Sequence, residues 1–331
     1  MEAGECAGIL HLKEGEDYYI IKEIGEGATS HVYLCQTIDN YQHALKLYSN
    51  DEAYQTETEL LRLMQPSKNI VKLLKSGEAM LEIGQGLEQF SVSSNFKRGP
   101  VKYGLFEYLP NGELFEYINV AKEGFSEKIA KIIFINLIDA VETCHISGIV
   151  HGDIKPENIL LSENFEIKLI DFGFSKNIDN GELIYQWSGT KIYSAPETNQ
   201  SGAHGYDGIK NDIFAMGVVL FILNFGHYPF ESPTLSDYNY KLIINKDYDT
   251  FWKLVNKSNL AISESLKDLI HKMLCFDSSS RISIEEIKTH PWVAEDNSDI
   301  MIETENDIIS QYKKEFMKRK EMIDESKIDY L

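Results

Sequence analysis

Two short polar motifs, each beside an apolar run, constrain this chain more than any other feature of its sequence. The first is a polar loop within residues 149–161 that carries Asp153, Lys155 and Asn158. In the second, a short apolar strand ends on Asp171, and a glycine follows two residues later. Such loops hold charged groups at a fixed depth. We therefore expect these acids and the amide to be gathered at one edge of the fold.

These side chains suit phosphoryl transfer, in which the protein mainly positions groups and neutralises charge on the moving phosphoryl. Asp153 can accept a proton from a hydroxyl group, and Lys155 can screen the transferring group. Asn158 and Asp171 offer hard oxygen ligands to Mg²⁺ that is held mainly by phosphate oxygens. Either motif alone would more often be a plain turn between strands, but the two in this order predict a catalytic site.

The pattern His-Gly-Asp with an asparagine five residues after the aspartate, followed by Asp-Phe-Gly, resembles the catalytic and metal loops of eukaryotic protein kinases. The lysine two residues after Asp153, Lys155, resembles the pattern of the serine/threonine branch of this family. The resemblance implies an α+β, bilobal fold with a small β-rich N-lobe and a larger helical C-lobe. It also implies ATP and Mg²⁺ as cofactors and protein substrates. Thr190, within residues 189–197, is expected to hydrogen-bond Asp153 and Lys155.

A glycine-rich hairpin resembles the loop with which this family approaches phosphate oxygens. It consists of Gly25, Glu26 and Gly27, with Val32 further on and Ser30 where the family has its third glycine. Taken alone, such a hairpin is more often a turn without a ligand.

A second N-lobe motif, Ala44-Leu-Lys46, resembles the Val-Ala-Ile-Lys strand of the family, so Lys46 is expected to hold the α and β phosphates. Glu57 and Glu59 can both pair with Lys46. We select Glu57, because it precedes an apolar pair at the spacing that the family uses. The remaining residues expected at the nucleotide, by position in the family, are Phe106, Glu107, Leu109, Glu113 and Leu160.

One family feature is missing from the catalytic loop. Gly152 stands where most relatives have the arginine that receives an activation-segment phosphate. We therefore predict that catalysis does not depend on a phosphate docked at that position. Two further residues are expected to be structural: Asp212 to brace the loop backbone, and Arg281 to pair with Glu197.

The sequence resembles most closely the calmodulin-dependent and related kinases, in its Gly-Glu-Leu-Phe hinge exit and its His-Pro-Trp end. Glu113 and Glu157 suggest a preference for basic residues upstream of the acceptor. Ile222 weakens this inference, because strongly basophilic relatives have a glutamate at that position.

The resemblance divides the chain into five parts. We expect a flexible N-terminal arm, an N-lobe with an enlarged turn at about 76–100, a hinge, a C-lobe, and a tail with an amphipathic helix. Their boundaries are 1–17, 18–106, 107–112, 113–293 and 294–331.

The tail helix, over residues 304–322, has an apolar stripe and many basic residues. Such a helix can bind calmodulin, fold over the substrate groove, or pack on the C-lobe as a structural appendage, which is the favoured reading. The stripe consists of Ile308, Ile309, Tyr312 and Phe316, and the basic residues are Lys313, Lys314, Lys318, Arg319 and Lys320.

The formal net charge of -20 argues against binding to nucleic acid or to anionic membranes over most of the surface. The longest uncharged run, residues 213–228, is short for a membrane span, so we expect a helix buried on all sides. Four scattered cysteines predict no disulfide framework. A cytoplasmic or otherwise intracellular location is expected, with the nucleus also compatible.

A competing hypothesis is a pseudokinase-type scaffold that binds nucleotide or partners without phosphoryl transfer. The presence of Lys46, Asp153, Asn158 and Asp171 argues against it.

Overall fold

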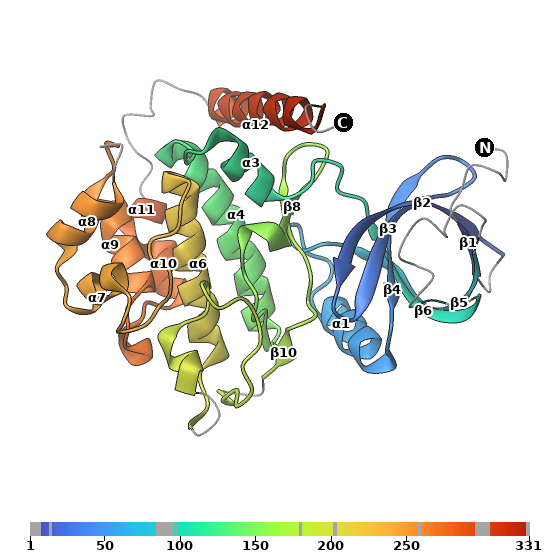
Figure 1. Ribbon diagram of the computed structural model, residues 1–331, viewed down its shortest axis with the longest axis horizontal. Coiled ribbons are helices and arrows are strands. Elements are labelled where there is room, and N and C mark those ends of the chain that lie inside the picture. Colours follow the sequence, from blue (N-terminus) through green and yellow to red (C-terminus); the bar gives the residue numbers. More distant parts are fainter. Residues whose placement is uncertain are drawn as a thin grey trace. The chain divides into compact units, whose positions relative to one another are not determined.

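The computed structural model describes residues 8–12, 15–83, 96, 98–178, 181–200, 204–256, 260–294 and 305–328. The chain forms two compact units. The first comprises Met1–Pro110 and Asp171–Gly173, and the second comprises Asn111–Ile170 and Phe174–Leu331. The first unit is rich in strands and the second is mainly helical, as expected for the α+β fold (Figure 1).

The strands of the first unit close into a barrel in the order β1-β2-β3-β4-β6-β5, and each neighbouring pair is antiparallel. The barrel interior is filled because alternate side chains of a strand point inward, as Leu45 and Leu47 do from β4. Lys46 lies between them and therefore belongs to the other face. The elements of this unit are β1 (Gly8–His11), β2 (Asp17–Gly27), β3 (Ser30–Gln36), β4 (Gln42–Tyr48), α1 (Asp51–Leu63), β5 (Leu73–Ile83) and β6 (Gly99–Glu107).

The first strand corrects the expectation that residues 1–17 form a flexible arm. Gly8–His11 pairs with β2 on one side and with β5 on the other, and Leu10 is fully buried in the barrel core. A four-residue strand has too little periodicity to be recognised in sequence. Here its backbone groups are satisfied on both edges, so the strand closes the barrel.

The enlarged turn predicted for residues 76–100 is also shorter in the structure. β5 continues to Ile83 and β6 begins at Gly99, so both ends of the predicted turn are paired strand. Residues 84–95 and 97 lie outside the described part of the chain.

Helix α1 begins at an Asn50 cap, whose side chain accepts a hydrogen bond from the backbone N–H of Ala53 at 2.8 Å. Glu57, Leu60 and Leu61 are buried together, because residues three and four apart share one face of a helix. The apolar pair thus turns the Glu57 carboxylate inward.

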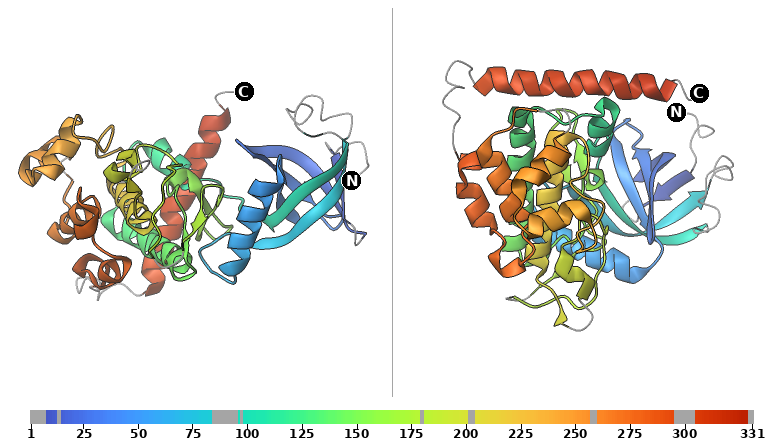
Figure 2. Two further views of the ribbon diagram at one scale, coloured as in Figure 1. Left: turned by 90° about the horizontal axis from the view of Figure 1, so that it is seen from below. Right: turned by 60° about the vertical axis from the view of Figure 1, so that its left-hand side comes forward.

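The second unit consists mainly of helices, which Figure 2 shows from two further sides. Its strands and short helices are β7 (Ile149–Val150), η2 (Pro156–Asn158), β8 (Ile159–Leu161), β9 (Ile167–Leu169), β10 (Lys176–Asn177), η3 (Pro196–Gln200), η4 (Ser278–Ser280), α10 (Ile284–Thr289) and α11 (Pro291–Ala294). Its longer helices are α3 (Leu114–Ala121), α4 (Glu127–Ile146), α6 (Gly208–Phe225), α7 (Tyr238–Ile244), α8 (Tyr248–Val255), α9 (Glu264–Met273) and α12 (Glu305–Ile328).

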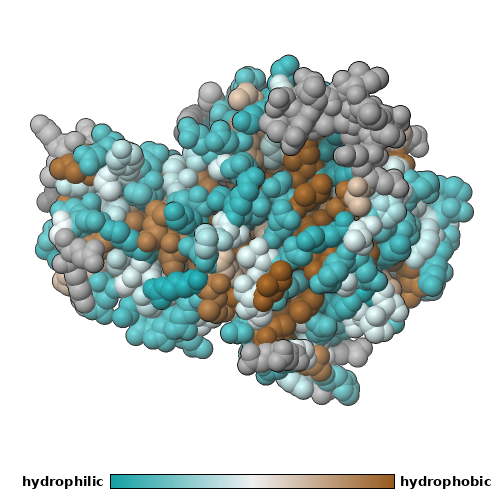
Figure 3. Space-filling view, turned by 180° about the vertical axis from the view of Figure 1, so that it is seen from behind, coloured by the Kyte–Doolittle hydropathy of each residue, from teal (hydrophilic) through white to brown (hydrophobic). Residues whose placement is uncertain are grey.

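Helix α6 is the centre of this unit. Among the described helices it alone has the length and apolar composition of a membrane span, and 89% of that window is buried inside the protein. The burial confirms the predicted helix for residues 213–225, but the helix ends at Phe225 because Gly226 takes a left-handed conformation, and residues 227 and 228 are exposed. On the face shown in Figure 3, hydrophilic side chains cover most of the surface, with smaller apolar patches between them.

Helix α12 packs on other parts of the second unit through Tyr312 and Phe316, two residues of the predicted apolar stripe. The Phe316 ring lies against Tyr117, Phe125 and Phe165, and the Tyr312 hydroxyl donates to the Phe165 carbonyl oxygen at 2.7 Å. Residue 304 and the side chains of residues 305–309, which include Ile308 and Ile309, lie outside the described part.

One of the five basic residues of the predicted helix, Arg319, faces the protein interior. Its side chain is buried and donates to the carbonyl oxygens of Tyr117 and Gly124 at 3.0 and 2.9 Å. Lys314 and Lys318 are exposed.

Candidate active site

The first unit brings together Lys46, Glu57 and Asp171. The Lys46 Nζ lies 2.7 Å from the Glu57 Oε2 and 3.2 Å from the Asp171 Oδ1. Strand β4 supplies the lysine and α1 supplies Glu57, whereas Asp171 takes a left-handed backbone conformation with φ of 60°. Glu57, rather than Glu59, is therefore the partner of Lys46.

The charge on Lys46 is stabilised by these two carboxylates. Burial alone would lower the pKa of the Lys46 ammonium, but the charges of Glu57 and Asp171 outweigh burial and raise the pKa. Lys46 is consequently a fixed cation.

Strand register aligns the other predicted residues of this unit. Gly25 on β2 lies opposite Val32 on β3, and Val32 lies opposite Lys46 on β4. Ala44 on β4 lies opposite Phe106 on β6. Because paired residues of adjacent strands lie on the same face, each row presents its side chains together.

The Gly25-Glu26-Gly27 segment forms the end of a β-hairpin, since Gly27 lies opposite Ser30. Ser30, at the third glycine position, is buried. The segment is thus extended, and its two glycines have no side chains that would block a ligand from the backbone.

The end of β6 carries Glu107 and, two residues later, Leu109. The Glu107 backbone N–H donates to the Lys72 carbonyl oxygen at 3.1 Å, and its Oε1 accepts the Lys72 backbone N–H at 2.8 Å. Leu109 is buried. These bonds fix the backbone that the sequence predicts to contact the base.

The second unit brings together Asp153, Lys155, Asn158 and Thr190. The Thr190 hydroxyl donates to the Asp153 Oδ1 at 2.8 Å, and the Lys155 Nζ lies 2.7 Å from the Asp153 Oδ2 and 2.9 Å from the Thr190 Oγ1. The Asn158 Nδ2 donates to the Asp153 carbonyl oxygen at 2.8 Å and to its Oδ2 at 3.0 Å. Asp153 is therefore buried, and its carboxyl group is oriented by these three neighbours.

The backbone of this loop is held from α6. The Asp212 Oδ2 accepts the His151 backbone N–H, and its Oδ1 accepts the Gly152 backbone N–H, each at 2.9 Å. The His151 ring bonds the Ile170 carbonyl oxygen at 3.0 Å. Asp212 braces the loop as predicted.

Gly152 has a φ of 80°, a conformation that favours glycine. A Cβ at this position would lie 3.0 Å from the Phe174 carbonyl oxygen. The loop geometry of this chain therefore suits glycine, and the position presents no cation.

Glu113 and Leu160 pair as an isolated antiparallel bridge within the second unit. Glu113 is the N-cap residue of α3. Partial burial of the Glu113 carboxylate raises its pKa, and the nearby charges of Glu116 and Glu157 raise it further.

Sequence reasoning missed the contacts that order the segment before α6. The Trp187 Nε1 donates to the Ser194 Oγ at 3.0 Å, and the Tyr193 hydroxyl lies 3.2 Å from the Tyr228 hydroxyl and 3.4 Å from the Glu157 Oε2. Tyr193 lies within the predicted 189–197 loop, but its partners Glu157 and Tyr228 are about 35 residues away in sequence, so the motif did not predict these contacts.

Each unit carries atoms of the kind that bind Mg²⁺ or phosphate. The Asn158 amide nitrogen is committed to Asp153, so the amide oxygen is the atom that can bind a metal. The Asp171 side chain is 40% exposed and supplies a carboxylate. Oxygen ligands of this kind suit Mg²⁺, and the Lys46 ammonium suits phosphate oxygens.

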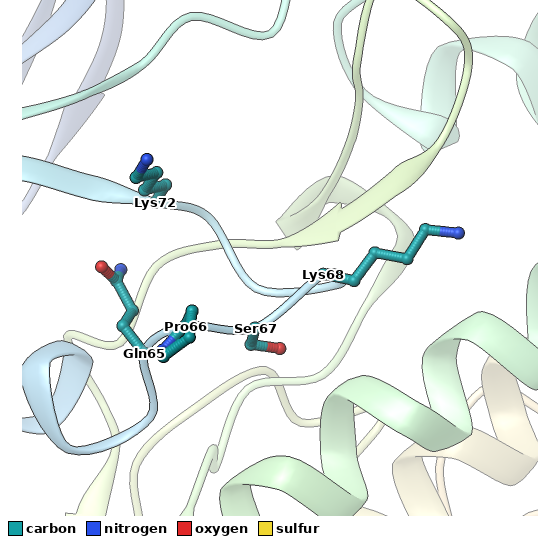
Figure 4. A pocket seen from close by; sticks show the side chains of 5 residues that line it. All are labelled: Gln65, Pro66, Ser67, Lys68 and Lys72. Atoms are coloured by element: carbon teal, nitrogen blue, oxygen red, sulfur yellow. The ribbon is translucent and has the colours of Figure 1, made fainter.

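A separate pocket of about 580 Å³ lies along the chain that follows α1. None of the predicted site residues lines it, and Lys68 and Lys72 extend in different directions (Figure 4). Its lining residues are Gln65, Pro66, Ser67, Lys68 and Lys72.

Comparison with known proteins gives one family match and many relatives. The family model described as the protein kinase domain matches residues 18–293. CBL-interacting protein kinases 11 and 26 of Oryza sativa subsp. japonica are 35% and 34% identical to the chain over 83% of its length. Serine/threonine-protein kinase SIK1 of Mus musculus is 30% identical over 84%. The chain spans 51%, 52% and 33% of these relatives, so it covers about half the length of the first two.

Proposed function

This chain belongs to the protein kinase domain family, and we propose that it transfers the γ-phosphate of ATP to serine or threonine hydroxyls of proteins. The relatives are serine/threonine kinases of the calmodulin-dependent-kinase-like group, as the sequence predicted. Kinases of this family generally use ATP with Mg²⁺.

The observation that carries the proposal is the arrangement of three groups around Asp153. Thr190, Lys155 and Asn158 all contact its carboxylate. In the proposed reaction Asp153 accepts the proton of the substrate hydroxyl, and Lys155 screens charge on the transferring phosphoryl.

The remaining residues would bind the nucleotide and metal. Lys46, oriented by Glu57, would hold the α and β phosphates, and Asn158 and Asp171 would hold Mg²⁺. The bound metal would supply neutralisation of phosphate charge. The hairpin and hinge residues proposed for nucleotide binding are Gly25, Glu26, Gly27, Val32, Ala44, Phe106, Glu107, Leu109, Glu113 and Leu160.

The decisive test is Asp153→Asn, compared with Asp249→Asn on the exposed first turn of α8. Transfer to a serine peptide should fall by about 10³-fold in D153N, while ATP affinity remains close to wild type. D249N should keep both properties. Undiminished transfer by D153N would refute the role of Asp153.

The competing proposal is a pseudokinase-type scaffold. It predicts that wild-type protein binds ATP without transferring phosphate to any peptide of an array.

For substrate choice we propose a preference for basic residues upstream of the acceptor. Glu113 and Glu157 lie near enough for their charges to interact, which supports a local negative potential. A peptide array with arginine scanned through the upstream positions tests it.

Two relatives are named for interaction with CBL, and we propose that this protein too is regulated by a partner protein. For α12, intramolecular packing is the preferred role. Calmodulin is the alternative partner. To bind the apolar stripe, it would have to displace Phe316 from its contacts with Tyr117 and Phe125. Titration of the chain with calcium-calmodulin, followed by calorimetry, separates these roles.

We also propose a cytoplasmic or other intracellular location, with the nucleus compatible. Three described cysteines, Cys35, Cys144 and Cys275, are free thiols, which supports a reducing compartment. Fractionation of cells that express the tagged protein tests the location.

A further inference from the structure

A small apolar cluster lies apart from the barrel core and holds segments that flank the catalytic loop. It consists of Val150, Ile178, Ile184 and Tyr206, with Ile209 packed against them. We call these five residues the activation-segment cluster. Val150 belongs to β7, directly before the catalytic loop, and Ile209 belongs to the first turn of α6.

The activation segment, which the family resemblance places at residues 174–187, contributes Ile178 and Ile184 to this cluster, and Ile184 is the one nearer to Thr190 in sequence. Its side chain is only 6% exposed, whereas those of Leu183 and Tyr185 are 40% and 60% exposed. Its backbone forms an antiparallel bridge with Tyr206, with N–O distances of 2.8 and 2.9 Å. The buried Ile184 side chain and these two backbone hydrogen bonds thus fix the second half of the segment.

Gly208 makes this close packing feasible. A Cβ there would lie 2.7 Å from the Ile184 Cδ1 and 2.8 Å from the Val150 Cγ2, closer than real Cβ contacts. The same helix, α6, carries the Asp212 that holds the catalytic loop. The cluster and the loop are therefore positioned by one rigid element.

Hydrogen bonds also link Lys176, whose backbone pairs with Val150 of the cluster, to the segment that carries Thr190. The Lys176 Nζ donates to the Gln186 carbonyl oxygen at 2.9 Å, and the next residue, Trp187, donates to the Ser194 hydroxyl. The Ser194 hydroxyl in turn donates to the Thr190 carbonyl oxygen at 3.1 Å. Thr190 contacts Asp153, so order in the segment is coupled to the orientation of the catalytic base.

We propose that the activation-segment cluster holds this segment in its active conformation without a phosphate, and that Ile184 is a positioning residue for Thr190. The inference rests on the proposed function. Gly152 presents no cation to a phosphate, so an apolar anchor supplies the restraint. Burial of a branched aliphatic side chain does not depend on a modifying enzyme, so the segment is ordered as soon as the chain folds.

The test uses the full chain after phosphatase treatment, with loss of phosphate verified by mass spectrometry. Hydrogen exchange of residues 183–194 is measured together with kcat, the peptide KM and ATP affinity. Ile184→Ala should raise exchange in this segment and lower kcat, each by about tenfold, with ATP affinity unchanged. Ile184→Val should behave like wild type, because it preserves most of the buried side chain.

Leu183→Ala is the matched control, because it removes a neighbouring exposed side chain of the same size, and it should change neither measurement. Ile184→Thr retains the branched shape, and it provides a folded variant with an intermediate effect if I184A unfolds.

Two results would overturn the inference: unchanged exchange in both I184A and I184T, or a wild-type segment that loses protection when its phosphate is removed. A protected wild-type segment in a protein that transfers no phosphate would instead overturn the proposed function, because exchange is measured without catalysis.

Discussion

The Arg319 guanidinium on α12 lies over the Phe125 ring, with its central carbon 3.9 Å from the ring centroid. The same group donates to the carbonyl oxygens of Tyr117 and Gly124, near the end of α3. Tyr117 lies within α3 and Gly124 follows its end by three residues. Arg319 therefore joins α12 to α3 and to the turn after it through buried hydrogen bonds.

Arg319→Met should detach or loosen α12. The variant leaves buried carbonyl oxygens without donors and removes the ring contact, at a cost of about 3 kcal/mol. Thermal unfolding and hydrogen exchange of residues 312–323 measure the effect. Lys318→Met removes the same charge from the adjacent exposed position, and it should leave the unfolding temperature and the exchange rates unchanged. If the two variants lose the same stability, the effect comes from the charge of the helix and not from the buried contacts of Arg319.

Glu197→Gln should destabilise the second unit. Arg281 forms two bonds to this carboxylate, from Nη1 to Oε1 at 2.7 Å and from Nη2 to Oε2 at 3.0 Å, and its side chain is fully buried. The substitution leaves the guanidinium charge buried without its counter-ion, which should cost about 3 to 5 kcal/mol.

Glu264→Gln is the control for this experiment, because Glu264 pairs with Lys267 while its side chain is 87% exposed. An exposed pair contributes less than about 1 kcal/mol. Equal shifts in the unfolding midpoint would show that burial adds nothing to the Arg281 pair.

His271 should make folding sensitive to mild acid. Its ring stacks on Tyr248, with the centroids 3.6 Å apart, and burial lowers the pKa of His271 to about 4. An unfolded histidine has a pKa of about 6.5, so the unfolded chain binds the proton more tightly between these values. The contribution of neutral His271 to the free energy of unfolding is therefore complete above pH 6.5. It is lost as the pH falls toward 4, which lowers the free energy of unfolding by at most about 3 kcal/mol.

The measurement is chemical denaturation of His271→Gln and wild type between pH 4 and 8. The substitution should flatten this part of the pH profile. His204→Gln, at an exposed position, should retain the wild-type profile; a profile unaffected by H271Q would exclude His271 as the source.

Glu113 should make the proposed preference for basic residues depend on pH. Its pKa is raised, so it loses its charge at a higher pH than an ordinary glutamate. As the pH is lowered from neutrality, the KM for a peptide with an upstream arginine should rise more than the KM for its alanine analogue. Glu113→Gln should abolish this difference, and a difference that persists in the variant would assign the preference to other acids.

Much of the candidate site could be predicted because its motifs are local. Asp153, Lys155 and Asn158 lie within one loop, and the helical spacing of Glu57 to Leu60 and Leu61 selected the correct partner for Lys46. Hydrogen bonds between neighbours in sequence need little more than the backbone turn.

The errors came from partners that are distant in sequence. Gly8–His11 is a strand because its backbone pairs with an edge of β2 on one side and an edge of β5 on the other. In the sequence, Arg319 cannot be distinguished from the neighbouring lysines. In the structure it is buried, and it donates hydrogen bonds to the carbonyl oxygens of Tyr117 and Gly124.

The sequence by itself determined the types of chemical group and the family, because these depend on residue identity at fixed spacing. Only the tertiary structure decided which basic residue is buried, and that Ile184 rather than its neighbours anchors the activation segment. Burial depends on what another segment places opposite a side chain, and that information is not contained in the local pattern.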